Sequence, residues 1–269
     1  LKERKRVIIN FLIIIQEMKM NNKFLHFSVD DVIDCFEDIF VNNYDSIFQN
    51  QFLLDWKTLH DESGLKLSLF CYYHNKNFSL DMFPDKYAYE FKSNSHWLHL
   101  GAHAFDYNVA KADDWRTYYI SYIRVMDELI RICGKNTLAI SLFPRLDCYK
   151  LPYKTWKKLE NYQYAPIGLL GNDKEKDSYF LTPEQNRILK DRGSVKVDGR
   201  FCVYATTVRL EEISNMSEVD IKERPCICFT HEWLWREKRI HLMELVRDLC
   251  ECNEKIGNKC LFPEEVVKL

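Results

Sequence analysis

The sequence lacks an excess of charge of either sign. Its 269 residues include 38 Lys or Arg against 40 Asp or Glu, which gives a formal net charge of −2. A protein that attracts nucleic acid or an anionic membrane through its overall electrostatic field needs a large excess of basic residues. The composition therefore gives no reason to expect nucleic acid as a partner.

A hydrophobic run long enough to cross a membrane is also missing. The apolar stretch at residues 7–15 follows a basic start, but it is far shorter than the ~20 apolar residues of a spanning helix. It looks like the beginning of a signal peptide, yet no small-residue cleavage site follows it. We expect residues 1–20 to be a peripheral extension, the protein to have no membrane span, and its location to be cytoplasmic.

Two further signatures are absent. No glycine-rich phosphate loop follows the first predicted strand, which disfavours a dinucleotide-binding open sheet. The ten cysteines form no disulfide framework, and most lie in apolar runs, as expected for buried thiols in a reducing compartment. Three of them cluster at Cys250, Cys252 and Cys260, but their spacing matches no common zinc finger and a fourth ligand is missing nearby.

What the sequence does contain is an alternation of strand-like and helical patterns. Strand patterns occur at residues 23–29, 65–73, 96–105, 137–144, 165–171, 199–208 and 225–233, and helical patterns at 32–40, 113–133, 155–162 and 239–253. Such alternation is typical of a parallel sheet with crossover helices. We predict one α/β domain over residues 21–269, a (β/α) barrel with mostly parallel strands, with an open doubly wound sheet as the rival.

Polar residues gather where these predicted strands end, which is where the chemistry of α/β barrels takes place. They are Asp30 and Asp31, His99 and His103, Arg145 and Asp147, Arg209 and Glu211, and His231 and Glu232. Adjacent carboxylates repel each other unless a nearby cation compensates their charge, which lets the two take different roles. A divalent metal would do so, with one carboxylate and imidazoles as ligands and the other carboxylate free as a base. This set predicts metal-assisted hydrolysis of an amide or ester. An Asp–Asp pair before a helix is also typical of an ordinary N-cap.

Three short motifs carry a resemblance to a known family. They are "SVDDV" at residues 28–32, "LFPRLDCY" at 142–149 and "ICFTHEWLW" at 227–235. In this order they resemble the polysaccharide deacetylase family of carbohydrate esterases. The resemblance implies a distorted (β/α) barrel, a mononuclear metal that is usually zinc, and removal of acetyl groups from N-acetylated sugars. It implies Asp30 as the catalytic base, His231 as the general acid and Arg145 as the residue that orients the base.

The same resemblance implies the metal ligands. Asp31 would be one, and the family's H-x-x-x-H motif would supply two histidines. In one register "HLGAH" provides His99 and His103, whereas in the other His103 is the first ligand and Tyr107 stands at the second position. We expect zinc or another divalent metal at Asp31, His103 and His99, with the choice between His99 and Tyr107 open.

The remaining expectations concern the substrate, an acylated sugar or glycan precursor. Arg209 and Glu211 share one face of a predicted strand and, with Trp233, are expected to contact the substrate, although the first two could instead form an internal ion pair. An inactive, glycan-binding relative of the deacetylases is the alternative. A glycosidase would need a distant carboxylate such as Glu211 or Glu232, since adjacent aspartates cannot straddle a sugar ring at ~5–9 Å.

Overall fold

The computed structural model describes residues 23–172, 177–199, 201–214, 219 and 225–267. The predicted extension at residues 1–20 lies outside these ranges. Within them, no helix is both long enough and apolar enough to cross a membrane.

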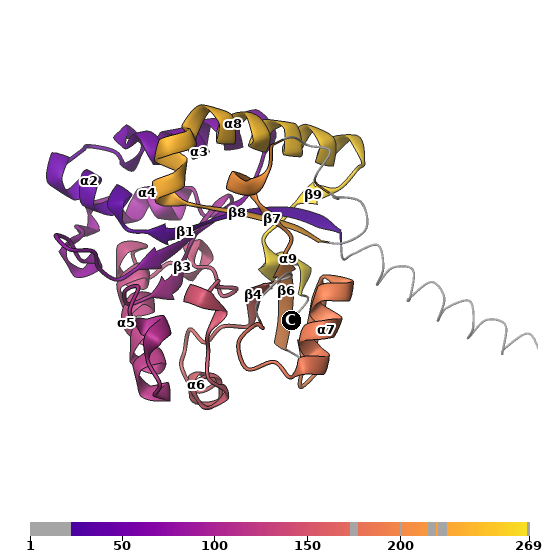
Figure 1. Cartoon of the computed structure of the whole chain (residues 1–269). Helices are drawn as coiled ribbons and strands as arrows, with labels where there is room; N and C mark the ends of the chain where they lie inside the picture. The colour runs from indigo at the N-terminus through magenta and orange to yellow at the C-terminus, as the bar shows by residue number, and fades with distance from the viewer. Residues whose placement is uncertain (1–22, 173–176, 200, 215–218, 220–224, 268–269) are drawn as a thin grey trace, which may run out of the picture.

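The larger sheet has six strands, and every pair in it is parallel. Its order is β3-β2-β1-β8-β7, and β9 also pairs with β1. The strands are β1 (Phe24–Val32), β2 (Leu67–Tyr72), β3 (Leu98–Ala104), β7 (Val208–Arg209), β8 (Cys226–His231) and β9 (Lys259–Cys260). Figure 1 shows the indigo β1 beside the orange β8, from opposite ends of the chain. The predicted α/β class with mostly parallel strands is confirmed.

A smaller sheet of β4 (Gly168–Asn172), β6 (Phe201–Thr206) and β5 (Ser194–Val197) adjoins the first, in the order β4-β6-β5 with β5 antiparallel. The segment 140–144 connects the sheets, because Ser141 N donates to Leu100 O on one side and Leu170 N donates to Pro144 O on the other. A Cβ atom on Gly101 would lie only 2.9 Å from the Phe70 ring, so a glycine is needed at this point of β3. Together the two sheets form a distorted barrel. The strand predicted at 137–144 is reduced to a bridge at Ile140, because residues 137–139 form a 3₁₀ turn.

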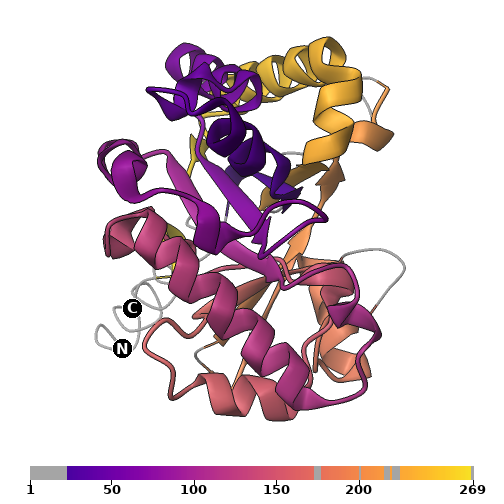
Figure 2. The same cartoon turned by 90° about the vertical axis from the view of Figure 1, so that its left-hand side faces the viewer.

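Helices cover the outside of the barrel. They are α2 (Asp34–Asn42), α3 (Gln51–Ser63), α4 (Ala88–Ser93), α5 (Trp115–Ile132), α6 (Tyr153–Leu159), α7 (Pro183–Arg192), α8 (Glu232–Lys255) and α9 (Pro263–Val266). Figures 1 and 2 show α3 and α8 packed together over β1, and α5 with α6 farther around the barrel beside β3. Local signals mark two helix ends: the Asp114 side chain caps α5, and Gly64, at φ +69°, ends α3.

Helix α2 begins in an unexpected way. Its N-cap residue, Ile33, makes no side-chain cap. Instead the buried Glu232 carboxylate, at the start of α8, accepts hydrogen bonds from the backbone N–H groups of Ile33, Asp34 and Cys35 at 2.9, 2.9 and 2.6 Å. A carboxylate is favourable at a helix N-terminus because it satisfies free N–H groups and complements the helix dipole. The capping interpretation of the Asp30–Asp31 pair is therefore wrong.

Candidate functional site

A cavity of about 200 Å³ opens where the parallel strands of the larger sheet end. Its lining combines six segments of the chain: Asp30, Asp31, Tyr72, His103, Arg145, Leu146, Asp147, Cys148, Tyr149, Arg209, Phe229 and His231. The structure thus brings six of the predicted site residues to one place. Parallel strands end at the same edge of a sheet, so the placement follows from the topology.

Arg145 and Asp30 form a buried ion pair on one side of this cavity. Arg145 Nη1 lies 2.8 Å from Asp30 Oδ1, and the arginine side chain is only 1% exposed. The guanidinium also donates to the hydroxyls of Ser28 and Thr206, and it lies over the Phe229 ring. These contacts fix the Asp30 carboxylate in the orientation that faces the cavity.

Asp31 contacts His103 directly. Asp31 Oδ1 is 3.2 Å from His103 Nε2, while His103 Nδ1 donates to the Arg145 carbonyl at 2.6 Å. Burial acts to raise the pKa of Asp31, but the hydrogen bond and charge of His103 outweigh it and hold that pKa at about 2. Burial acts to lower the pKa of His103, but the charges of Asp30 and Asp31 raise it to about 9. The two side chains therefore form an ion pair.

The backbone at Asp31 is unusual. Its φ is +60°, within an irregularity of β1 between Val29 and Val32. This left-handed conformation favours glycine, and aspartate tolerates it better than most other residues. Val32, and not a glycine, follows the aspartates, and Asp31 itself adopts the left-handed conformation at this turn.

His231 faces the cavity from β8, and Asp30 is its register partner on β1. His231 Nδ1 donates to Glu211 Oε1 at 2.8 Å. Burial acts to lower the pKa of His231, but the hydrogen bond to Glu211 and the charges of Asp30, Glu211 and Asp31 raise it overall. Glu211 lies behind the imidazole and does not line the cavity. It is also 3.9 Å from Arg209 Nε, so the internal ion pair is the arrangement found.

Two aromatic residues border the site. Trp233 is 46% exposed, and its Nε1 donates to Asp31 Oδ2 at 3.3 Å. Tyr72 packs edge-on against the His103 ring, and burial with the nearby charge of Asp31 raises the pKa of its phenol. Tyr72 was not among the predicted site residues, although it lies at the carboxyl end of β2, where site residues are expected.

The structure places His99 away from the cavity. Its ring stacks on Phe262 at 3.5 Å between centroids, and its Nε2 donates to Ser95 O. Burial lowers the pKa of His99 to about 3. Four residues of a strand span roughly 13 Å, so His99 and His103 share a face of β3 at opposite ends. This placement corrects the expectation that the two histidines bind one metal.

The described residues do not fit the zinc site that the resemblance implies. Tyr107, the other candidate position, is 66% exposed and lies against Lys111. Zinc in catalytic sites takes three protein ligands, whereas Asp31 and His103 are two and contact each other. Within the ranges that the structure describes, no three His, Cys, Asp or Glu residues are grouped to hold a metal ion.

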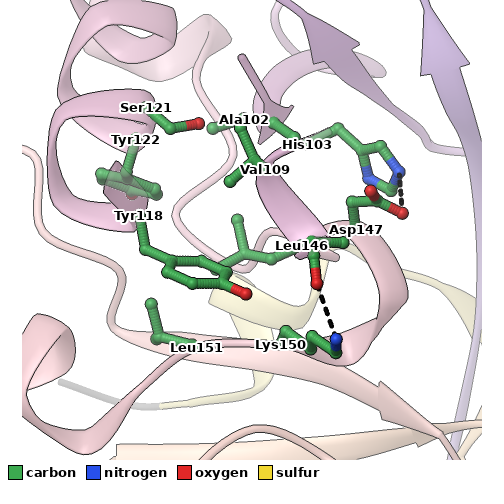
Figure 3. A pocket seen from close by; sticks show the side chains of 12 residues that line it. Ala102, His103, Val109, Tyr118, Ser121, Tyr122, Leu146, Asp147, Lys150 and Leu151 are labelled. Carbon is green, nitrogen blue, oxygen red and sulfur yellow. Dashed lines mark hydrogen bonds and ion pairs between the residues drawn. The ribbon is translucent and has the colours of Figure 1, made fainter. Parts of the chain in front are cut away.

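A second, much smaller cavity of about 20 Å³ adjoins the first. Figure 3 shows it between the end of β3, α5 and the segment 146–151, with the side chains of His103 and Asp147 pointing toward one another. Asp147 Oδ1 is 4.0 Å from His103 Nε2. The volume suffices for about one water molecule. Asp147 is thus a second carboxylate beside His103, in addition to Asp31. No role was predicted for Asp147 from the sequence.

No protein-family model and no curated protein matches the chain. Among solved structures, it is similar to the Xyl-CE4 domain of a multidomain xylanase from the hindgut metagenome of Trinervitermes trinervoides (10% identity, TM-score 0.46, covering 91% of this chain and 89% of that one). It is also similar to a peptidoglycan N-acetylglucosamine deacetylase (12%, 0.44, 90% and 86%) and to a CE4 family pseudoenzyme from Bacillus anthracis (8%, 0.46, 92% and 66%). A deacetylase and a pseudoenzyme are thus both among these structures, at identities too low to indicate catalytic residues or substrate.

Proposed function

We propose that the chain hydrolyses an acyl group, in the simplest case acetyl, from an N- or O-acylated sugar or glycan precursor. The observation that supports this is the pairing of Asp30 and His231 across one cavity. They are register partners on neighbouring parallel strands, and each is held by a buried partner of opposite charge. Hydrolysis of an acyl group needs such a base and acid on either side of the acyl carbon.

In this proposal Asp30 takes a proton from the water that attacks the acyl carbon. Arg145 and its hydroxyl partners keep the carboxylate aimed into the cavity. His231 gives its proton to the leaving amine or alcohol as the bond to the acyl carbon breaks, which releases the carboxylic acid. The raised pKa of His231 favours the protonated imidazole that this role needs, and Glu211 positions the ring.

The border of the cavity suits a sugar ring. Trp233 offers an exposed aromatic face beside Asp31, and such faces commonly stack on the apolar side of sugars. Arg209 lines the cavity and keeps part of its guanidinium exposed. We assign to these two residues contact with the sugar and with its polar groups.

One observation favours a second candidate, a module that binds acylated glycans without cleaving them. Asp31 and His103 contact each other at 3.2 Å, and no three donors among the described residues are arranged to hold a metal ion. For this reason, no step of the proposed reaction uses a metal ion. The two candidates share the cavity and differ in whether product is formed.

The test is acetate release from a panel of N-acetylated and O-acetylated oligosaccharides. We expect Asp30→Asn and His231→Asn to lower the rate at least ~100-fold, and Asp61→Asn to leave it unchanged, because Asp61 is on the exposed side of α3. Circular dichroism would establish that all variants are folded. Binding of these sugars by NMR without acetate release would favour the binding module. Neither release nor binding would overturn both candidates.

A further inference from the structure

Four thiols gather between α8 and the larger sheet, at the opposite end of the strands from the candidate site. They are Cys226 and Cys228 on β8, Cys250 on α8 and Cys260 on β9. The Sγ atoms of Cys226 and Cys228 are 3.7 Å apart, and Cys250 and Cys260 are close enough for each thiol to shift the pKa of the other. The part of the chain that the structure describes contains no group of three donors arranged for a metal, so we consider the chemistry of the thiols themselves.

Only one pair of these thiols faces open space. A cavity of about 630 Å³ is lined by Cys250 and Cys260, together with charged side chains of both signs: Arg247, Lys259, Glu62, Glu251 and Glu254. Cys226 and Cys228 are completely buried and do not line it. A small solute can therefore reach the pair from α8 and β9.

The pair also has a favoured nucleophile. The interaction with Cys260 lowers the pKa of Cys250 against the opposing effect of burial. The same interaction, with burial, raises the pKa of Cys260. The thiolate is the reactive form of cysteine, so Cys250 reacts first and Cys260 is placed to follow.

We propose that Cys250 and Cys260 are a redox-active dithiol that a peroxide converts to a disulfide. The Cys250 thiolate attacks one oxygen of hydrogen peroxide, the O–O bond breaks, and hydroxide leaves, which gives a sulfenic acid. The Cys260 sulfur then attacks the Cys250 sulfur and loses its proton, the S–O bond breaks, and the departing hydroxide takes up that proton as water. Both sulfurs are oxidised, and the peroxide is reduced to water.

The position of this pair gives the disulfide a structural effect. Cys260 begins the C-terminal segment whose Glu264 Oε1 accepts hydrogen bonds from Ser141 Oγ at 2.8 Å and from the backbone N–H groups of Leu142 and Phe143. That segment supports the chain just before Arg145. A cross-link to α8 restricts the unfolded chain, so oxidation is expected to raise Tm by several degrees. The inference is independent of the proposed function.

The experiment treats the folded full chain with hydrogen peroxide, blocks the remaining thiols, and maps peptides without reduction. We expect one cross-linked peptide that joins Cys250 to Cys260, with Cys226 and Cys228 blocked as free thiols after unfolding. Cys250→Ser should abolish the cross-link. Cys260→Ser should leave a Cys250 sulfenic acid that dimedone traps, which shows that the variant folds and keeps the nucleophile.

Cys252→Ser is the matched control, because Cys252 is on the same helix, is partly exposed, and does not line the cavity. It should form the cross-link as the unchanged chain does. The proposal is overturned if Cys250 and Cys260 stay free after peroxide treatment, or if either thiol cross-links to a different cysteine.

Discussion

Arg145 Nη1 lies 2.8 Å from Asp30 Oδ1, with both side chains almost completely withdrawn from water. A charge buried without a partner is costly, whereas a pair that is also hydrogen-bonded is tolerated. Ser28 and Thr206 provide those additional hydrogen bonds. The candidate site is thus built around one satisfied buried ion pair.

Arg145→Met is expected to lower the free energy of unfolding by about 3–5 kcal/mol, because it leaves the Asp30 carboxylate buried and unpaired. Urea denaturation measures this loss. Arg247→Met is the control, because its ion pair with Glu62 is exposed and should contribute less than about 1 kcal/mol. Equal effects of the two substitutions would contradict the importance of burial.

Glu232→Gln is expected to change how stability depends on pH. Burial raises the pKa of Glu232 from 4.5 to about 7 despite the three backbone N–H donors. The folded state therefore binds this proton more tightly than the unfolded state, and its contribution to stability is complete below pH 4.5 and lost as pH rises through about 7. Urea denaturation at several pH values should show the stability of the unchanged chain, relative to the variant, falling across that window. A pH-independent difference would refute the expectation.

Glu211→Gln is expected to lower the pKa of His231, because it removes the charge that helps keep the imidazole protonated. Titration of the His231 ring protons by NMR measures the change. Glu212→Gln serves as the control, because the Glu212 carboxylate is exposed and pairs with Arg209. An unchanged His231 pKa in the Glu211 variant would show that the contact does not act on the imidazole.

Added zinc is expected to raise Tm by less than about 1 °C, because a ligand that binds weakly stabilises little and Asp31 and His103, the expected ligands at the site, contact each other and belong to no described group of three donors that could hold a metal. Thermal unfolding with and without zinc or a chelator measures this. His103→Ala should respond as the unchanged chain does. A rise of several degrees that disappears in both Asp31→Ala and His103→Ala would reverse the conclusion that the site does not fit zinc.

Trp233→Ala is expected to raise the Kd for an acylated oligosaccharide about threefold to tenfold, which corresponds to the loss of one aromatic contact. Stability should change little, because the side chain is nearly half exposed. NMR titration measures the affinity. Tyr89→Ala, on the exposed face of α4 at 78% exposure, should leave the Kd unchanged, and equal effects would remove Trp233 from the binding surface.

The sequence predicted what depends on local pattern. Apolar runs of the right length indicated β1, β2, β3 and β8, and the helical pattern at residues 113–133 indicated α5. Because parallel strands end at the same edge of a sheet, the sequence also predicted that Asp30, Asp31 and His231 lie close together. Short polar elements such as α7 and β9 were not predicted, since they bury too few apolar residues to produce a periodic signal.

Tertiary structure decided the rest. The spacing in the sequence predicted that His99 and His103 lie on one face of a strand. Because of the rise along the strand, they lie at opposite ends of β3, where His99 stacks on Phe262. The sequence suggested that Asp30 and Asp31 cap the following helix. In the structure Glu232, about 200 residues away in the chain, caps α2 instead. Contacts between distant segments have no local signature, because they depend on which strands pair and how far along them each side chain lies.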